Sequence, residues 1–315
     1  MQLTGIHHLS AISANAPGNL HFYTQVMGMR LIKKTVNQDD VSAYHLFYGD
    51  GAASPGSDLT FFDYRTGPSR HGNNSITNTA LRVNGLDALK WWRKHLDGAQ
   101  VKVADIGERD GRWTLDFADP EGLQLSLVDD GGAGDAHPWM ESPVPEEFQI
   151  RGLGPVTITV PDRMVSDVIL RELLLMRHVR DYPVPDSQTD IVHVYEMGEG
   201  GPAAELHVAA RPDVPRAQPG AGGVHHVAFR TPNRAEYDGW ARRLVDLKVP
   251  NSGKVNRFYF ESLYFRDPHG ILFEIATDGP GFDADEPMEK LGETLSLPPF
   301  LEKRRAEIEA TLKPL

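Results

Sequence analysis

The chain contains four copies of one short unit, and this internal repetition limits its fold more than any other feature of the sequence. The two clearest copies end alike, in FADPEGLQLSLVDD at 117–130 and FRDPHGILFEIATD at 265–278. Each has an Asp-Pro-x-Gly turn, in which Pro fixes φ and Gly supplies a positive φ. Alternating apolar residues follow the turn, and this alternation is typical of a strand with one buried face.

The same two copies also begin alike. A short strand is expected at SITNTALRV (75–83) and another at GVHHVAFRT (223–231). Apolar residues at helical spacing follow each strand, in LDALKWWRKHL (86–96) and AEYDGWARRLVDL (235–247). Each copy is therefore predicted to be a βαβββ module, which is one strand, one helix and three more strands.

Two weaker copies begin at GIHHLSAIS (5–13) and LGPVTITVP (153–161). The four modules are predicted to span 3–65, 74–131, 151–210 and 221–278. We expect an α+β fold with two pseudo-symmetric domains, in which 3–131 and 151–278 each hold two modules. The segments 131–148 and 211–222 are rich in Gly or Pro and are predicted to be connectors. A C-terminal tail, 279–315, is predicted to contain a helix after its Pro-Pro break.

The amino-acid composition limits the kinds of functional site that the chain can form. The chain has no cysteine, which excludes disulfides, zinc–thiolate sites and cysteine nucleophiles. A metal would have to be held by His, Asp or Glu, and such ligands suit iron, manganese or zinc. The net charge of −12 argues against nucleic-acid binding and favours a neutral substrate. The apolar stretches are too short to span a membrane and no signal peptide is visible, so we expect a cytoplasmic protein.

The four modules differ at two places that can carry chemistry. The first strands of modules one and four contain His7-His8 and His225-His226, where modules two and three have Thr77-Asn78 and Gly154-Pro155. In the last strand, Glu274 of module four lies where module two has Ser126. An ionisable side chain on an apolar strand is costly to bury without a partner, and a metal ion is such a partner. Two imidazoles and one carboxylate would leave open positions on that metal.

Only one histidine of each pair can point to a given face of the sheet, and the residue pattern alone does not decide which. We take the second of each pair, so the predicted metal ligands are His8, His226 and Glu274. A single histidine on a strand is more often a hydrogen-bonded core residue, but two His-His pairs at equivalent positions favour a metal. Other residues of these types are interpreted as structural: His45, His71, His193, His207 and, as a structural or surface residue, Glu205.

With its repeated modules, its HHL and HHV strands and the run LYFRDPHGILFE, the chain resembles the vicinal oxygen chelate superfamily, in which βαβββ modules pair around a metal. More narrowly, it is similar to the ring-cleaving dioxygenases that act on hydroquinones, a group that includes dichlorohydroquinone 1,2-dioxygenase. The resemblance implies Fe(II), with Mn or Zn as substitutes, held by His8, His226 and Glu274. It also implies an extradiol-type dioxygenase that uses O2 to open a small hydroquinone-like aromatic ring, and superfamily habit suggests a homo-oligomer.

The resemblance further implies catalytic roles for His7, His225, Arg257 and Tyr264, and a substrate-binding role for Ser10. A neutral His7 or His225 is expected to accept the proton of the substrate, with a pKa near physiological pH. Arg257 stays protonated and would stabilise negative charge that develops on oxygen. It stands where catechol-cleaving relatives carry an acid–base histidine, which favours hydroquinones over catechols.

Several alternatives stay open at this point. The residues also allow a surface ion pair of Arg257 with Glu261 and a packing role for Tyr264. A redox-neutral isomerase of the glyoxalase type, with Zn or Ni, usually adds a second carboxylate, where this chain has Thr60 and Ser126. A non-catalytic protein that binds a small molecule is the other alternative.

The location of the histidines also predicts how the modules pair. Module three has Gly154-Pro155 where a ligand would be needed, so the first-strand histidine must come from module one. Modules one and four are therefore expected to pack together, with two and three as the other pair. Aromatic residues of module four, such as Phe229, Phe258, Tyr259 and Phe273, are candidates for the lining of the substrate pocket, although most of them are expected in the core.

Overall fold

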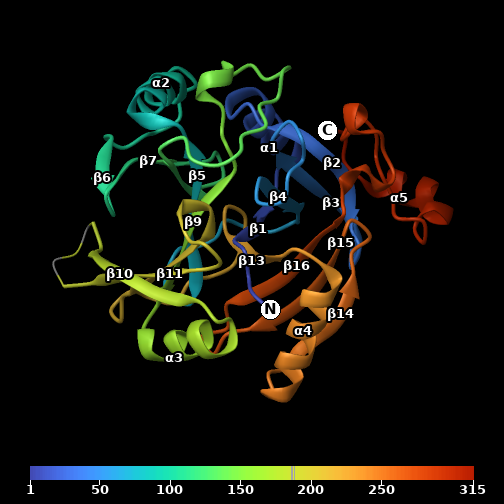
Figure 1. Cartoon of the computed structure of the whole chain (residues 1–315). Helices are drawn as coiled ribbons and strands as arrows, with labels where there is room; N and C mark the ends of the chain where they lie inside the picture. The colour runs from blue at the N-terminus through green and yellow to red at the C-terminus, as the bar shows by residue number, and fades with distance from the viewer. Residues whose placement is uncertain (186, 188) are drawn as a thin grey trace.

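The computed structural model describes residues 1–185, 187 and 189–315. Its strands form two sheets of eight strands each (Figure 1). Each half of the chain, 3–131 and 151–278, contributes one module to each sheet. None of the described helices is long and apolar enough to cross a membrane.

The first sheet combines modules one and four in the order β14-β15-β16-β13-β1-β4-β3-β2. Module one supplies β1 (Ile6–Ser13), β2 (Arg30–Asn37), β3 (Asp40–Gly49), β4 (Asp58–Asp63) and the short helix α1 (Ala16–His21), which continues as a π-helical turn at Phe22–Val26. Module four supplies β13 (Val224–Thr231), α4 (Arg234–Asp246), β14 (Asn251–Asn256), β15 (Phe260–Arg266) and β16 (Leu272–Pro280).

The second sheet combines modules two and three in the order β10-β11-β12-β9-β5-β8-β7-β6. Module two supplies β5 (Ser75–Val83), α2 (Gly85–Gly98), β6 (Gly107–Arg109), β7 (Arg112–Ala118) and β8 (Gln124–Asp129). Module three supplies β9 (Leu153–Val160), α3 (Arg163–Val168), a π-helical turn at Ile169–Leu173, β10 (Arg177–Pro183), β11 (Ile191–Glu196) and β12 (Glu205–Ala210).

The structure confirms the α+β fold, the βαβββ order of all four modules, and the pairing of module one with four and of two with three. In both sheets the first strands of the two modules meet in the middle as an antiparallel pair, β1 with β13 and β5 with β9. Each first strand also pairs in parallel with the last strand of its own module. This arrangement places the first and last strands of modules one and four side by side.

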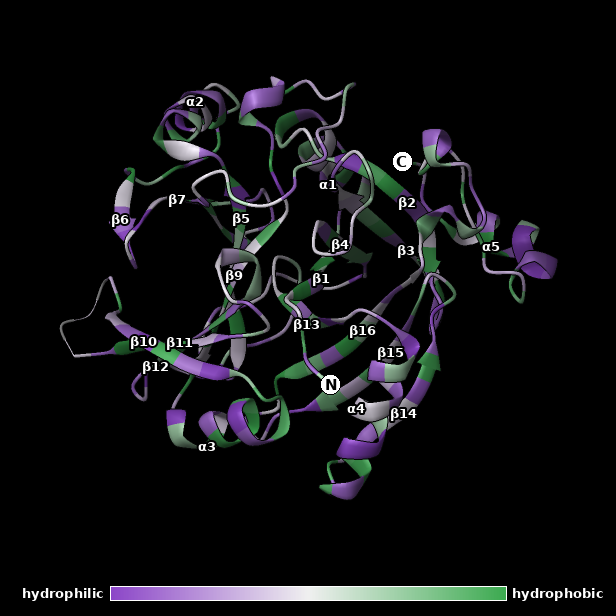
Figure 2. Ribbon diagram, viewed as in Figure 1, coloured by the Kyte–Doolittle hydropathy of each residue, from purple (hydrophilic) through white to green (hydrophobic). Residues whose placement is uncertain are grey.

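One large apolar core connects the two sheets. It contains Leu9 and Phe61 of the first sheet, Leu81 of the second, and the helix residues Trp92 and Trp240. Figure 2 shows hydrophobic stretches along the central strands and a largely hydrophilic α5 (Arg305–Thr311) at the edge of the molecule. Burial of these apolar surfaces is the main stabilising contribution, because apolar area is removed from water on both sides of each central strand.

The C-terminal tail packs beside β2 and β3, and β16 extends two residues into the predicted tail. The helix expected there is α5, and its Ile308 packs in a small cluster with Val36, Leu297 and Leu301. The tail is also held by charge, because buried Lys33 contacts Asp285 Oδ1 at 2.7 Å and Glu286 Oε2 at 2.6 Å. Since Val36 lines the cavity described below, the tail supports one of its walls.

Candidate metal centre

His8, His226 and Glu274 lie on three adjacent strands of the first sheet. Ala228 on β13 pairs with His8 on β1 and with Glu274 on β16, and His226 precedes Ala228 by two positions on the same face. The His8 and His226 Nε2 atoms are 3.3 Å apart. Glu274 Oε2 is 3.2 Å from His8 Nε2 and 2.9 Å from His226 Nε2. The register of three strands therefore brings the predicted ligands together.

The three side chains have the features of a cation site. All three are buried, and Glu274 Oε2 makes no well-formed hydrogen bond although two ring nitrogens face it. Burial alone would raise the pKa of Glu274, but the two imidazoles outweigh it and hold that pKa well below its usual range. Separations of 2.9 to 3.3 Å are those of neighbouring ligands about 2.1 Å from one ion. The residues present thus fit a divalent metal.

The first histidine of each pair holds the ring of the second. His7 Nδ1 lies 2.9 Å from His8 Nδ1, and His225 Nδ1 lies 2.7 Å from His226 Nδ1. Such a bond orients the ligand ring and leaves its Nε2 facing Glu274. Burial lowers the pKa of His7 and of His225 to about 3, so both rings are neutral at physiological pH. The expectation that these pKa values lie near physiological pH is wrong.

A cavity of about 260 Å³ opens beside the candidate ligands, and His8 and His226 are among its lining residues. Six of its lining residues are aromatic: Phe47, Phe62, Tyr64, Tyr259, Phe260 and Tyr264. This volume lies just below the usual range of ligand pockets, roughly 300 to 1,000 Å³, and suits a ligand of about one ring. Ser10, His225 and Arg257 also line the cavity, whereas His7 is not among its described lining residues.

The structure confirms that most of the four aromatic residues named from module four belong to the core. Of the four aromatic residues named from module four, Tyr259 lines the cavity. Phe229 and Phe273 are buried in the main core, where their rings lie 5.3 Å apart, and Phe258 packs against the smaller cluster around Phe282. Module one contributes Phe47 from β3 and Phe62 from β4, two neighbouring strands of the first sheet, to the cavity lining.

Arg257 and Tyr264 act as a pair at the cavity wall. Arg257 Nε donates to Tyr264 Oη at 3.2 Å, and its Nη2 contacts Asp39 Oδ2 at 3.0 Å. The alternative ion pair of Arg257 with Glu261 does not form, since Glu261 pairs with Arg234. Burial raises the pKa of Tyr264, so the phenol keeps its proton at neutral pH.

His45 was interpreted as structural, and the structure places it in the cavity instead. Its Nε2 lies 3.0 Å from Thr60 Oγ1, which in turn lies 2.8 Å from Ser10 Oγ. The His45 ring packs against Phe47 and Phe62, with centroids 4.0 and 4.1 Å away. A lone histidine in DVSAYHLFYG gave no sequence signal of this, because the strand alternation alone does not tell the cavity side from the solvent side.

Ser262 is a second residue that the sequence analysis missed. It is buried on β15, and its Oγ donates to Glu274 Oε1 at 2.5 Å. The bond fixes the rotamer of the carboxylate and leaves Oε2 for the two histidines. A polar residue inside the apolar run FESLYF was the available signal, because a buried hydroxyl needs a partner.

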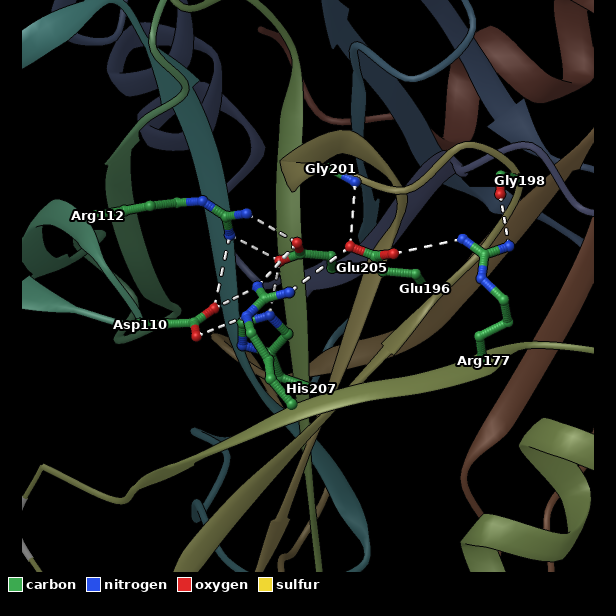
Figure 3. A network of polar contacts seen from close by, with 9 residues as sticks. Asp110, Arg112, Arg177, Glu196, Gly198, Gly201, Glu205 and His207 are labelled. Atoms are coloured by element: carbon green, nitrogen blue, oxygen red, sulfur yellow. Dashed lines mark hydrogen bonds and ion pairs between the residues drawn. The ribbon is translucent and has the colours of Figure 1, made fainter.

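The second sheet carries the counterpart of Glu274 without its histidines. Glu205 on β12 is buried, and Arg112 contacts both of its oxygens, at 2.7 and 2.8 Å (Figure 3). Arg180 Nη2 and His207 Nε2 lie 2.9 and 3.0 Å from the same carboxylate. Two guanidinium groups thus occupy the place of a cation. The interpretation of Glu205 as structural fits these contacts, and a surface position does not.

Two further groups of His, Asp and Glu side chains come close together among the described residues. One is the arginine-bound group of Asp110, Glu205 and His207. The other is His178, Asp181 and His193 on the hairpin of β10 and β11, where Asp181 and His178 are partly exposed. The group of His8, His226 and Glu274 alone is buried on all three members without an arginine bound to its carboxylate.

Comparison with known proteins agrees with this architecture. The family model of the Glyoxalase/Bleomycin resistance protein/Dioxygenase superfamily matches residues 5–127 and 153–275. Over the full length of both chains, the protein is 48% identical to MhqA of Bacillus subtilis, named as a candidate ring-cleaving dioxygenase. It is 30% identical to the chlorohydroquinone/hydroquinone 1,2-dioxygenase of Sphingobium indicum, over 99% of this chain and 96% of that protein.

A solved structure of a dioxygenase candidate from Bacillus subtilis superposes with a TM-score of 0.90 at 33% identity, over 100% of this chain and 98% of that one. The family model covers both halves of the chain, including β1, β13 and β16, on which the candidate ligands lie. The chain therefore belongs to the Glyoxalase/Bleomycin resistance protein/Dioxygenase superfamily.

Proposed function

We propose that the protein is an Fe(II)-dependent dioxygenase that cleaves the ring of hydroquinone-like aromatic compounds. The observation that carries the proposal is a buried set of two histidines and one glutamate at the end of a one-ring cavity with aromatic walls. The names of the relatives support the same chemistry, because one of them acts on chlorohydroquinone and hydroquinone.

His8, His226 and Glu274 would hold the metal through the three atoms that converge in the sheet. When bound, Fe(II) supplies redox chemistry toward O2 and lowers the pKa of a phenolic hydroxyl. His7 and His225 keep the ligand rings in place, and Ser262 keeps the carboxylate in place. His7, His225 and Ser262 are therefore positioning residues, and His225 also lines the cavity.

The cavity residues would bind and orient the substrate. Because Arg257 Nε donates to Tyr264 Oη, the phenolic proton of Tyr264 is free to be donated to a substrate oxygen. The guanidinium group stabilises negative charge on the reacting oxygens. Ser10 and His45 line the same cavity and are joined through the Thr60 hydroxyl, and this pair can bind the second hydroxyl of a para-dihydroxy ring. Aromatic walls exclude water and pack on the faces of the ring.

The presence of Thr60 argues against a glyoxalase-type isomerase. The last strand of module one carries Thr60 where such an enzyme would place its second carboxylate, and the hydroxyl of Thr60 is already shared between Ser10 and His45. A binding protein without turnover would have no need for an ionised carboxylate facing two buried imidazoles. A dioxygenase therefore accounts for more of the polar groups at the site than an isomerase or a binding protein does.

The test is metal reconstitution. Stripped protein is loaded anaerobically with Fe(II), Mn(II) or Zn(II), and O2 uptake and absorbance of the ring-opened product are followed with hydroquinone and with catechol. We expect Fe(II) to restore uptake of one O2 per hydroquinone, and Glu274→Gln to abolish it. No O2 uptake with either substrate in any metal form would refute the proposal. Sedimentation and cell fractionation test the expected homo-oligomer and cytoplasmic location.

A further inference from the structure

A second cleft of about 410 Å³ lies next to the metal cavity and shares two side chains with it, His225 and Leu272. It is built where the two connectors between the sheets, 64–74 from β4 to β5 and 211–223 from β12 to β13, meet the turn before β16. Backbone bonds join the connectors, since Arg70 and Gln218 exchange N–H···O bonds of 2.9 Å and Asn73 pairs with Arg216. The floor of the cleft is therefore a paired backbone rather than two independent loops.

Three arginines line this cleft: Arg70, Arg216 and Arg266. No carboxylate is among its described lining residues, and within the described part of the chain none of the three arginines makes an ion pair. Arg266 Nη1 donates to the Gly270 carbonyl at 2.7 Å, which fixes that side chain at the rim. In a chain with a net charge of −12, three guanidinium groups without an ion pair among the described residues make this cleft locally positive.

The metal cavity differs in charge. Apart from its histidines, its charged lining residues are Arg257 and Asp39, which contact each other at 3.0 Å. A neutral phenol can enter such a cavity without an electrostatic cost, whereas the arginine cleft offers an anion three cationic side chains with no carboxylate among its described lining residues. His225 and Leu272 line both spaces, so the arginine cleft lies directly beside the metal cavity.

We propose that the arginine cleft binds the carboxylate of the ring-opened product and draws it out of the metal cavity, an inference that rests on the proposed function. Ring cleavage breaks the bond between a hydroxyl-bearing carbon and its neighbour, and each of these carbons receives one atom of O2. The first becomes a carboxylic acid and the second an aldehyde, with O2 as the oxidant. The acid then releases one proton to solvent, so a neutral substrate becomes an anion of the same carbon count.

The cleft is tested by calorimetric titration of the metal-loaded protein with hexanoate, a six-carbon carboxylate, and with 1-hexanol as its uncharged counterpart. We expect hexanoate alone to bind, and binding to weaken as salt is added. The double variant Arg70→Gln/Arg216→Gln should bind it roughly tenfold more weakly, because each charge-assisted hydrogen bond at an exposed site contributes a few-fold. Arg93→Gln, which removes an exposed arginine paired with Asp105, is the matched control.

A kinetic measurement separates this inference from the proposed function. The double variant should keep the KM for hydroquinone and show weaker inhibition by accumulated product, and Arg93→Gln should match the wild type. If hexanoate binds equally to the wild type and the double variant, the proposal that the arginine cleft binds a carboxylate is wrong, even if the enzyme turns over. Absence of turnover in every metal form overturns both the proposed function and the role of the cleft in product release. If hexanoate binding still depends on the arginines in that case, the cleft is an anion site and the proposed function alone is wrong.

Discussion

The ion pairs that Lys33 makes with Asp285 and Glu286 of the C-terminal tail allow a quantitative test of how burial changes the contribution of an ion pair to stability. Lys33 is 0% exposed, and its Nζ lies between Asp285 (20% exposed) and Glu286 (9% exposed) and 4.6 Å from the centre of the Tyr259 ring. Replacing Lys33 by Met leaves two carboxylates without their cation. Removal of one partner from a buried ion pair costs about 3 to 5 kcal/mol.

The lower end of that range applies here, because each carboxylate keeps another donor. Asp285 retains the Tyr259 hydroxyl at 2.9 Å, and Glu286 retains the Thr294 hydroxyl at 3.1 Å. We therefore expect Lys33→Met to lower the free energy of unfolding by about 3 kcal/mol. For a chain of this size the melting temperature should fall by about 6 °C, at roughly 2 °C per kcal/mol.

Urea unfolding followed by circular dichroism measures the change, and Lys90→Met is the matched control. Lys90 pairs with Asp87 at 2.9 Å, a similar distance, but their side chains are 59% and 90% exposed. Its removal should cost less than about 0.5 kcal/mol. The triple variant Lys33→Met/Asp285→Asn/Glu286→Gln should regain most of the lost stability, since no buried charge is then left unpaired. Equal stability of Lys33→Met and wild type would refute the reasoning.

Three further predictions concern the two carboxylate sites. In thermal unfolding, Fe(II) at 100 times its dissociation constant should stabilise the wild type by about 2.7 kcal/mol, and Glu274→Gln should lose this shift; a metal-induced shift that persists in the variant would contradict the ligand assignment. Ser262→Ala should weaken metal binding roughly 10- to 100-fold in competition with a chelator, because the carboxylate loses the bond that orients it; unchanged affinity would remove Ser262 from the site. Burial acts to raise the pKa of Glu205, but Arg112 and His207 outweigh it and hold that pKa well below its usual range. The stability that results is present above the unfolded-state pKa of about 4.3 and is lost as pH falls below it, so urea unfolding of Glu205→Gln should show a weaker acid dependence than the wild type, and an identical dependence would argue against the network.

Local pattern was enough to predict the modules. The run SITNTALRV predicts a strand at 75–83 and the structure has β5 at those residues, because two-residue alternation is a property of the strand itself. The helix expected at 86–96 is α2, Gly85–Gly98, for the same reason at helical spacing. Comparison of the repeats also singled out the His-His pairs and Glu274, since an ionisable residue stands out where another copy of the module has an uncharged one.

Cross-strand register was beyond the reach of the sequence. His8 and His226 are 218 positions apart, and either member of each pair could have faced the cavity. The bulges in the β1–β13 pairing and the pairing of Ala228 with both His8 and Glu274 select the second histidines. His45 and Ser262 were missed because their partners, Thr60 and Glu274, lie on neighbouring strands.

The repeat by itself determined the module, its four copies and the residues in which the copies differ, because these depend on short-range spacing. The tertiary structure alone decided what each buried carboxylate binds. Glu274 and Glu205 stand four residues after a glycine in their modules, yet the first faces two imidazoles from β1 and β13 and the second is held by Arg112 from β7 and Arg180 from β10. The physical reason is that a buried charge takes its partner from the strands that sheet pairing brings beside it, and that pairing is a long-range property.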